Sequence, residues 1–267
     1  MQTAEKELFQ VGVQSSRSVA PGIHELVLER HSAIDQAQPG QFVHVAASRG
    51  IDPLLRRPMS ISSVGADGEW SLLFRVKGTG TQALSSLTAG ELVDVLGPLG
   101  RGFTWPEATT QPLLVAGGLG VAPLRFLAQR LCESGFRPRI LLGFATAQEA
   151  VCSDDFQTLG LVAEVATDDG SLGHRGFVTD LLPTASDSLQ VYACGPLSML
   201  RAVVTFCQQR QVPCEVSLEE RMACGVGACL GCVCPIRPSG SKDWVWQRVC
   251  EEGPVFDGTE VAFDVMC

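Results

Sequence analysis

The sequence predicts a chain of three parts: an antiparallel β-barrel, a doubly wound parallel α/β domain and a small cysteine-rich module at the C-terminus. Three observations predict this fold class. Short, near-alternating apolar segments separated by turn residues fill the first hundred residues. Strands and helices then alternate for another hundred residues, and four cysteines stand within residues 222–235, MACGVGACLGCVCP.

We expect the barrel to span residues 1–108, the α/β domain 109–212 and the cysteine module 213–267. The strands expected in the barrel are residues 22–30, 40–47, 70–78 and 91–98, with a short helix at 80–87. In the α/β domain the expected strands are 112–118, 137–145, 161–170 and 189–196, and the expected helical stretches are 121–135, 147–160 and 197–211. The C-terminal tail is expected to end in a hairpin-like segment at 253–265.

Composition limits the class of protein. Apolar residues make up 45% and charged residues 18% of the 267, which predicts folded cores. The net charge of −9 argues against nucleic acid or an anionic membrane as partner. The opening MQTAEKELFQ lacks the apolar segment of a signal peptide, and no stretch is long and apolar enough for a membrane span. We therefore expect a cytoplasmic protein with reduced thiols, and the odd count of eleven cysteines disfavours a disulfide framework.

Two turns of the α/β domain are expected to bind a dinucleotide. The first is a glycine cluster between a buried strand and a helix, where the backbone can approach a pyrophosphate. Its match to the dinucleotide fingerprint is incomplete, and such a turn also serves as an ordinary connection. The second turn, in YACGP, ends another strand at the same sheet edge, and its cysteine fits a buried small residue as well as a pocket wall. The predicted residues are Gly117, Gly118, Gly120, Cys194, Gly195 and Pro196.

The choice of coenzyme depends on charge. The segment after the second α/β strand, GFATAQEA (143–150), offers no Arg or Lys to meet a 2′-phosphate. The sequence therefore favours NADH over NADPH.

Two barrel segments suit an anion. In LLRRPMSIS (54–62) an arginine, a proline and a hydroxyl residue follow one another, and FRVKGTGT (74–81) places glycines and a threonine at the start of the short helix. Taken alone, these segments are also compatible with a surface arginine and a hairpin turn.

Five segments in this order resemble the ferredoxin–NADP reductase superfamily: RRPMSIS, KGTGT, GPLGRGF, GGLGVAPL and YACGP. The resemblance covers nearly the whole chain and implies that the barrel binds FAD. The residues that it implies for the FAD are Arg57, Pro58, Met59, Ser60, Arg75, Val76, Gly80 and Thr81.

The cysteines predict a 2Fe-2S cluster. Cys224, Cys229 and Cys232 have the C-x4-C-x2-C spacing of plant-type ferredoxins, which needs one distant fourth ligand, and Cys250 is the candidate. A structural zinc site more often shows paired C-x2-C knuckles, so zinc fits less well. Cys234 competes for a ligand position but is only two residues from Cys232, and we leave it out.

Three segments resemble, more narrowly, the electron-transfer subunits of class 1B dihydroorotate dehydrogenase: residues 167–182, 219–235 and 250–256. This resemblance implies a role in pyrimidine biosynthesis, with electrons passing from an FMN-containing catalytic subunit through the 2Fe-2S cluster and FAD to NAD+. It also implies a heterotetramer of two plus two chains. No catalytic residue for dihydroorotate is expected in this chain. Two alternatives remain: a related subunit of an NAD(P)H-dependent ferredoxin or sulfide reductase, and a zinc-stapled nucleotide-binding regulator that is not an enzyme.

Overall fold

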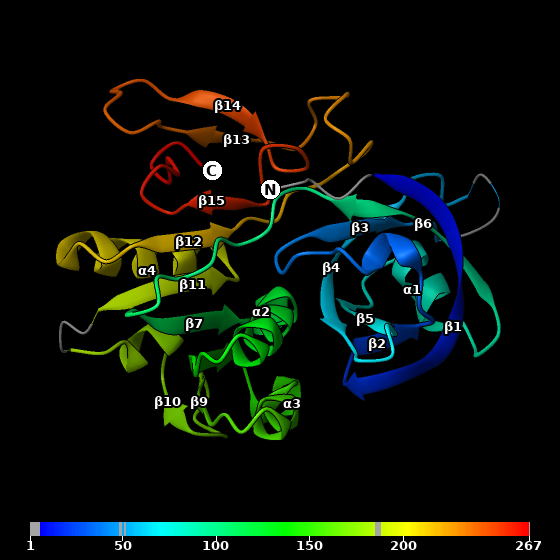
Figure 1. The fold of residues 1–267 in the computed structure, drawn as a ribbon, viewed down its shortest axis with the longest axis horizontal. Coiled ribbons are helices and arrows are strands. Elements are labelled where there is room, and N and C mark those ends of the chain that lie inside the picture. The colour runs from blue at the N-terminus through cyan, green and yellow to red at the C-terminus, as the bar shows by residue number, and fades with distance from the viewer. Residues whose placement is uncertain (1–5, 48–49, 51, 185–187, 267) are drawn as a thin grey trace.

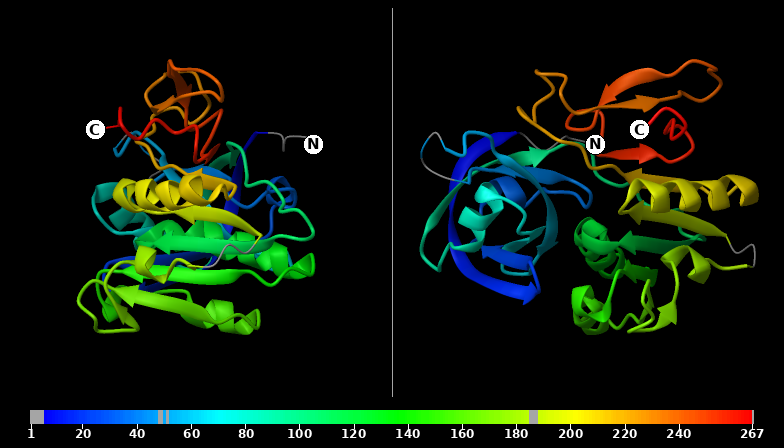
Figure 2. Two further views of the ribbon diagram at one scale, coloured as in Figure 1. Left: turned by 90° about the vertical axis from the view of Figure 1, so that its left-hand side faces the viewer. Right: turned by 180° about the vertical axis from the view of Figure 1, so that it is seen from behind.

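A computed structural model of the chain describes residues 6–47, 50, 52–184 and 188–266. A barrel lies beside a seven-stranded sheet, and a two-stranded hairpin lies above the sheet (Figure 1). The same three bodies are distinct from behind, whereas in the side view the sheet and its helices stand in front of the barrel (Figure 2). Within the described residues, no helix combines the length and apolar character that crossing a lipid bilayer requires.

Six antiparallel strands close the barrel in the order β1-β2-β5-β4-β3-β6, which leaves no open sheet edge. Trp70 is fully buried inside it, and its indole N–H donates to the carbonyl oxygen of Glu29 at 3.0 Å. The sequence did not predict the long strand β1, whose second half is mostly polar. The barrel elements are β1 (Glu7–Ala20), β2 (Ile23–Leu28), β3 (Phe42–Val45), β4 (Arg57–Val64), β5 (Trp70–Arg75), α1 (Thr79–Ser85) and β6 (Leu92–Leu99), with a 3-10 turn at Ser32–Ile34.

The second sheet has the order β10-β9-β8-β7-β11-β12-β15 and is parallel except for β15. Alternate residues of β7 and β11 face opposite sides: Leu114 and Tyr192 pack toward α2, and Val115 and Val191 toward α4. Its elements are β7 (Gln111–Gly117), α2 (Val121–Glu133), β8 (Arg139–Phe144), α3 (Ser153–Thr158), β9 (Ala163–Thr167), β10 (His174–Arg175), β11 (Leu189–Cys194), α4 (Leu197–Arg210) and β12 (Cys214–Ser217), with 3-10 turns at Gly118–Gly120, Ala147–Glu149 and Val178–Leu181.

The tail differs from the expectation. β15 (Val255–Asp257) does not form a C-terminal hairpin but pairs antiparallel with β12, because β12 would otherwise leave an open edge of the main sheet. The hairpin of this region is instead β13 (Val233–Ile236) with β14 (Val245–Arg248). The main sheet therefore continues past residue 213 and encloses both ends of the cysteine-rich segment.

A buried ion pair joins the barrel and the α/β domain. Glu25 on β2 is almost fully buried and accepts from Arg125 of α2 at 2.7 Å and from Arg17 of β1 at 2.5 Å. Arg125 also pairs with Asp155 of α3 at 3.0 Å. Since α2 places Phe126 in the barrel core beside these charges, the two bodies share one packed interface.

Candidate functional site

The two predicted nucleotide turns lie at one edge of the seven-stranded sheet and border a cavity of about 530 Å³. Gly117, Gly118 and Pro196 line it, as sequence analysis predicted. Gly120, Cys194 and Gly195 do not. Lining residues that the sequence did not single out are Gly143, Phe144, Ala145, Asp168, Phe177, Val178, Thr179, Ser198, Met199 and Ala202.

Gly120 has a packing role. A Cβ atom added there would lie 2.0 Å from the carbonyl oxygen of Cys194, so only glycine lets the two turns touch. Gly118 differs: its φ is +54°, and no atom of the described chain lies within 4 Å of an added Cβ. Gly120 therefore holds the cavity's two walls together, while Gly118 leaves the backbone open toward the cavity.

Cys194 is buried beneath this edge and lies opposite Ser217 in the register of β11 and β12. Burial raises the pKa of its thiol, the nearby charge of Glu219 acts in the same direction, and Ser217 acts against both. The thiol therefore stays protonated at neutral pH and serves as a small packing group.

The wall of this cavity carries negative charge. Asp168 follows β9 and belongs to the wall, and the described lining residues include no lysine or arginine. A coenzyme with an additional 2′-phosphate would meet no cation here, which agrees with the preference expected for NADH.

A second cavity of about 320 Å³ lies between the barrel, the sheet edge and the segment that leads to the cysteines. Six of the eight residues expected at the FAD line it: Arg57, Pro58, Met59, Ser60, Arg75 and Thr81. The strand β4 presents the first four, and β5 ends at the fifth.

The other two residues support this cavity without lining it. A Cβ at Gly80 would lie 2.5 Å from the guanidinium of Arg57, so the glycine allows the guanidinium to lie flat on α1. Val76 packs against the barrel core. Thr81 Oγ1 accepts from the backbone N–H of Lys77 at 2.9 Å and from that of Gly78, the N-cap of α1, at 3.2 Å. Arg75 is already paired with Glu149 at 2.7 Å.

The opposite wall comes from residues that the sequence did not single out: Ser217, Leu218, Glu219, Glu220, Met222 and Pro254, with Leu119 and Ala122 from the first nucleotide turn and α2. Desolvation raises the pKa of Glu219, and Lys77 across the cavity opposes this. These residues carry no local sequence signal, because only the folding of β12 beside β11 brings them to the barrel.

The two cavities are neighbours along the chain. Gly118 lines the first and Leu119 lines the second, so a single 3-10 turn separates them. Met222 and Pro254 line the second cavity within four residues of Cys224 and Cys250. The second cavity therefore lies between the nucleotide crevice and the cysteine loop.

The four predicted cluster cysteines lie as two pairs. The side chains of Cys232 and Cys250 are buried against each other, and those of Cys224 and Cys229 are in contact nearer the surface. No three His, Cys, Asp or Glu side chains of the described ranges are spaced to hold a single metal ion. Two thiol pairs instead match a two-iron cluster, in which each iron takes two protein ligands.

Backbone N–H groups point at these thiols. Desolvation acts to raise the pKa of Cys224, but the N–H groups of Val226, Cys229 and Ala228 outweigh it and lower the pKa to about 6. Gly227 N donates to Cys250 Sγ at 3.2 Å. The loop therefore favours the thiolate of Cys224, the form that binds iron, whereas burial and the neighbouring Cys232 raise the pKa of Cys250 to about 12.

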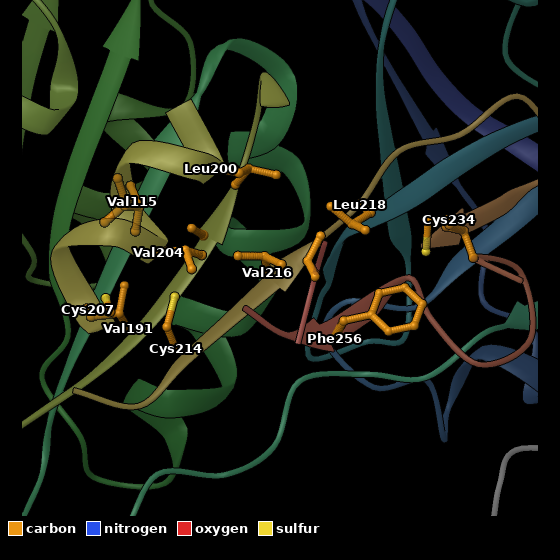
Figure 3. Close-up of a cluster of buried hydrophobic side chains, with 14 of the residues drawn as sticks. Val115, Val191, Leu200, Val204, Cys207, Cys214, Val216, Leu218, Cys234 and Phe256 are labelled. Carbon is orange, nitrogen blue, oxygen red and sulfur yellow. The ribbon is translucent and has the colours of Figure 1, made fainter. Parts of the chain in front are cut away.

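Cys234, the cysteine that competes for a ligand position, is a core residue. It is fully buried on β13 within an apolar cluster that includes Leu218 and Phe256 (Figure 3). Burial raises the pKa of its thiol to about 12, and nearby Glu220 adds to this. Cys232 and Cys250 belong to the same buried cluster, so burial does not separate Cys234 from the predicted ligands, and its exclusion stays a prediction.

One buried imidazole lies between the barrel and the cysteine loop. His44 on β3 is fully buried, and its ring lies against Gly225, next to Cys224. Burial, and secondly the charge of Arg56, lower its pKa to about 4, so the ring is neutral. Sequence analysis missed His44, because nothing near it in the chain indicates a cluster.

Comparisons with known proteins agree with this geometry. Residues 219–262 match the family described as the iron-sulfur cluster binding domain of dihydroorotate dehydrogenase B, and residues 114–205 match the oxidoreductase NAD-binding domain. A protein of Bacillus mycoides named dihydroorotate dehydrogenase B (NAD(+)), electron transfer subunit, is 45% identical over 255 residues, which cover 93% of this chain and 96% of that protein. A Bacillus cereus protein of the same name is 44% identical with the same coverage.

A similar solved structure is that of an NADH-dependent reduced ferredoxin-NADP oxidoreductase, described for flavin-based electron bifurcation. It is 29% identical, with a TM-score of 0.82, and the match covers 95% of this chain and 90% of the other. The barrel, the α/β domain and the C-terminal segment thus occur together in a related oxidoreductase.

Proposed function

Since the chain belongs to the family of the electron transfer subunits of dihydroorotate dehydrogenase B, we propose that it transfers electrons between a dihydroorotate-oxidising partner and NAD+. It is an FAD and 2Fe-2S oxidoreductase subunit that uses NAD+ or NADH as co-substrate, and it acts in pyrimidine biosynthesis.

The proposal rests on the spatial order of three sites: the nucleotide crevice, the flavin cavity and the cysteine loop. The cavity expected to hold the flavin shares a turn with the nucleotide crevice on one side, through Gly118 and Leu119. On the other side it shares a wall with the cysteine loop, through Met222 and Pro254. When bound, FAD exchanges electrons in pairs with a nicotinamide and singly with an iron–sulfur cluster, so it belongs between them.

The role of the chain's own residues is to bind and orient the flavin and the nicotinamide coenzyme. We assign Arg57 to the flavin's phosphates, since a guanidinium fork suits them, and Thr81 to the wall beside it. Pro58, Met59 and Ser60 form the adjoining wall. Leu119 and Ala122 restrict water on the side that faces the crevice.

We assign the pyrophosphate of NAD to the turn at Gly117 and Gly118, and the nicotinamide end to the walls near Pro196 and Met199. Asp168 suits a ribose hydroxyl and repels a phosphate. In this arrangement no side chain has to act as acid or base toward dihydroorotate, whose oxidation belongs to the partner.

The partner's docking surface is proposed at the cysteine loop. Leu230 is 63% exposed beside the exposed Cys229, and its φ of +57° is unusual for a leucine. Val226 is also exposed on this loop. An apolar, exposed cluster edge suits a partner that receives or supplies electrons. We propose that this partner is an FMN-containing dihydroorotate dehydrogenase subunit, in a cytoplasmic assembly of two plus two chains.

Reconstitution tests the proposal. The purified chain, loaded with FAD and cluster, is expected to pass electrons from NADH to artificial acceptors and to show no dihydroorotate oxidation. Addition of an FMN-containing dihydroorotate dehydrogenase subunit should confer NAD+-dependent oxidation of dihydroorotate. Oxidation by the isolated chain, or failure of that subunit to bind, would overturn the proposal.

The same experiment also tests the alternative that the chain is a subunit of a ferredoxin or sulfide reductase. The similarity to a ferredoxin-NADP oxidoreductase gives it a basis, although the identity there is 29% against 45% for the dihydroorotate dehydrogenase relative. NADH-dependent reduction of ferredoxin or polysulfide, without any response to the FMN-containing subunit, would favour this alternative.

A further inference from the structure

The barrel strand β3 carries a side chain whose hydrogen bonding is incomplete. Both ring nitrogens of His44 are buried, and neither has a hydrogen-bond partner within the described part of the chain. A neutral imidazole has one N–H donor and one acceptor nitrogen. A buried polar atom without a partner destabilises the fold, so such an atom in a native core needs an explanation.

The cysteine loop packs directly against the ring. On the barrel side, the ring of Phe42 meets it edge to face at 6.0 Å between centroids. On the other side lies Gly225: an added Cβ would be 2.8 Å from both Nδ1 and Cε1 of His44 and 3.1 Å from Cγ, so Gly225 covers the face of the ring. Gly225 directly follows the predicted ligand Cys224. The imidazole therefore contacts the loop that is expected to wrap the cluster.

Gly225 makes this approach possible. Its φ is +70°, a conformation that side chains disfavour, and any Cβ would displace the imidazole. The loop thus brings its backbone against the ring without a side chain between them. A polar ring that is enclosed this closely, yet left without a partner, fits a site completed by a bound group.

We propose that His44 donates a hydrogen bond from its imidazole N–H to a sulfur of the bound 2Fe-2S centre, either the Cys224 thiolate or a cluster sulfide. The inference rests on the proposed cluster site. His44 is a positioning residue here: it binds no iron, but it links the cluster to the barrel strand that pairs with the flavin segment, since His44 lies opposite Pro58.

The hydrogen bond has an expected effect on the cluster. Reduction adds negative charge to the sulfurs, so a donor stabilises the reduced form more than the oxidised form and raises the reduction potential. Loss of the donor should shift the reduced-to-oxidised ratio about tenfold at a given potential, which corresponds to ~59 mV for one electron.

Pulsed EPR on the full chain tests the proposal directly. The protein is labelled with 15N-histidine, loaded and reduced, so that any coupling to the cluster electron comes from one of the four histidines. The wild-type chain should show one such coupling, which His44→Leu and His44→Gln should abolish. His31→Leu, a barrel control whose ring stacks on Phe9, should keep it.

Redox titration adds a second readout. His44→Leu should lower the midpoint potential, and His44→Gln, which keeps an N–H donor, should recover part of the loss. If His44→Leu does not fold, the labelled wild type and His44→Gln decide the question. A wild-type chain that binds iron and sulfide but shows no histidine coupling overturns this inference alone. A wild-type chain that binds neither overturns the proposed cluster as well.

Discussion

The barrel has two interfaces, and they differ in how their polar groups are satisfied. Against the α/β domain, Glu25 and Arg125 are buried as a hydrogen-bonded pair, and Arg75 pairs with Glu149. Against the cysteine module, His44 is buried with both nitrogens unpartnered among the described residues. The charged groups of the first interface satisfy one another, whereas the imidazole of the second needs the bound cluster to complete its hydrogen bonding. Loading of the cluster should therefore affect the second interface more than the first.

Loss of the cluster should have the largest effect on the second interface. We expect Cys224→Ala, Cys229→Ala, Cys232→Ala and Cys250→Ala each to abolish the cluster, because each removes one thiolate ligand. The measurement is iron and acid-labile sulfide per chain after anaerobic purification.

Cys234→Ala is the matched control. It should keep the cluster and cost about 1 kcal/mol of stability through the lost packing of a fully buried side chain. A variant at Cys234 that loses iron, together with a Cys250 variant that keeps it, would reverse the ligand assignment.

The first interface is broken by Glu25→Gln. The substitution leaves Arg125 buried with only Asp155, and we expect a loss of about 3 kcal/mol in the free energy of unfolding at neutral pH. Asp35→Asn, which breaks the exposed pair with Arg30, should change the stability little.

The same pair predicts a pH dependence. Desolvation acts to raise the pKa of Glu25, but Arg125 and Arg17 outweigh it and hold the pKa below its ordinary value of 4.5. A depressed native pKa stabilises the fold above the unfolded-state pKa, and this contribution is lost as the pH falls through the native value. The difference between wild type and Glu25→Gln should therefore shrink below pH 4.5 in urea unfolding; a constant difference would exclude the pair as its source.

Gly100→Ala tests how closely the second interface is packed. Gly100 has a φ of +73°, and an added Cβ would lie 2.5 Å from Pro254 Cδ and 2.7 Å from the carbonyl oxygen of Gly253. We expect a cost of about 2 kcal/mol in thermal or urea unfolding, and a cluster that is lost more readily to chelator. Gly90→Ala has a similar φ of +87° but no described neighbour within 4 Å, so it should cost only about 1 kcal/mol. Equal costs would show that backbone strain, not contact, sets the effect.

Coenzyme choice should give the smallest effect in free energy. NADH should reduce the flavin at least about tenfold more efficiently than NADPH, because Asp168 lines the crevice without a cation beside it in the described lining. Stopped-flow bleaching of the flavin with each coenzyme measures this ratio, and Asp168→Asn should reduce the preference for NADH. Equal rates of bleaching by NADH and NADPH in the wild-type chain would contradict the electrostatic argument.

The parts of the site that were predicted from sequence are formed by residues close together in the chain. The turn at Gly117–Gly120 and the spacing of Cys224, Cys229 and Cys232 are short patterns with a direct physical reason, and the structure brings them to the cavity edge and the thiol pairs. Sequence also predicted the barrel, the α/β domain and their order. The functional assignment of individual site residues stays a prediction.

The residues that sequence analysis missed reach the site through contacts between segments that are far apart in the chain. Ser217 and Glu219 reach the barrel because β12 lies beside β11, and the tail forms β15 rather than a hairpin because that sheet edge is available. His44 meets Gly225 across 181 positions of the chain, and neither residue's neighbours indicate the contact. The helical stretch expected at 147–160 is interrupted because Cys152 adopts a φ of +66° before α3. Tertiary contacts decide such features, and a single sequence does not display them.

The walls of the flavin cavity have one further consequence, for biosynthesis. Arg57 and Ser60 are made early in translation, whereas Met222 and Pro254 are made much later. A nascent chain can fold its barrel long before it can enclose the cofactor. Enclosure of the flavin therefore has to wait for the segment that reaches Pro254, and products truncated before Met222 should accumulate without flavin. The cavity thus makes cofactor retention depend on synthesis of the segment that carries the cysteines.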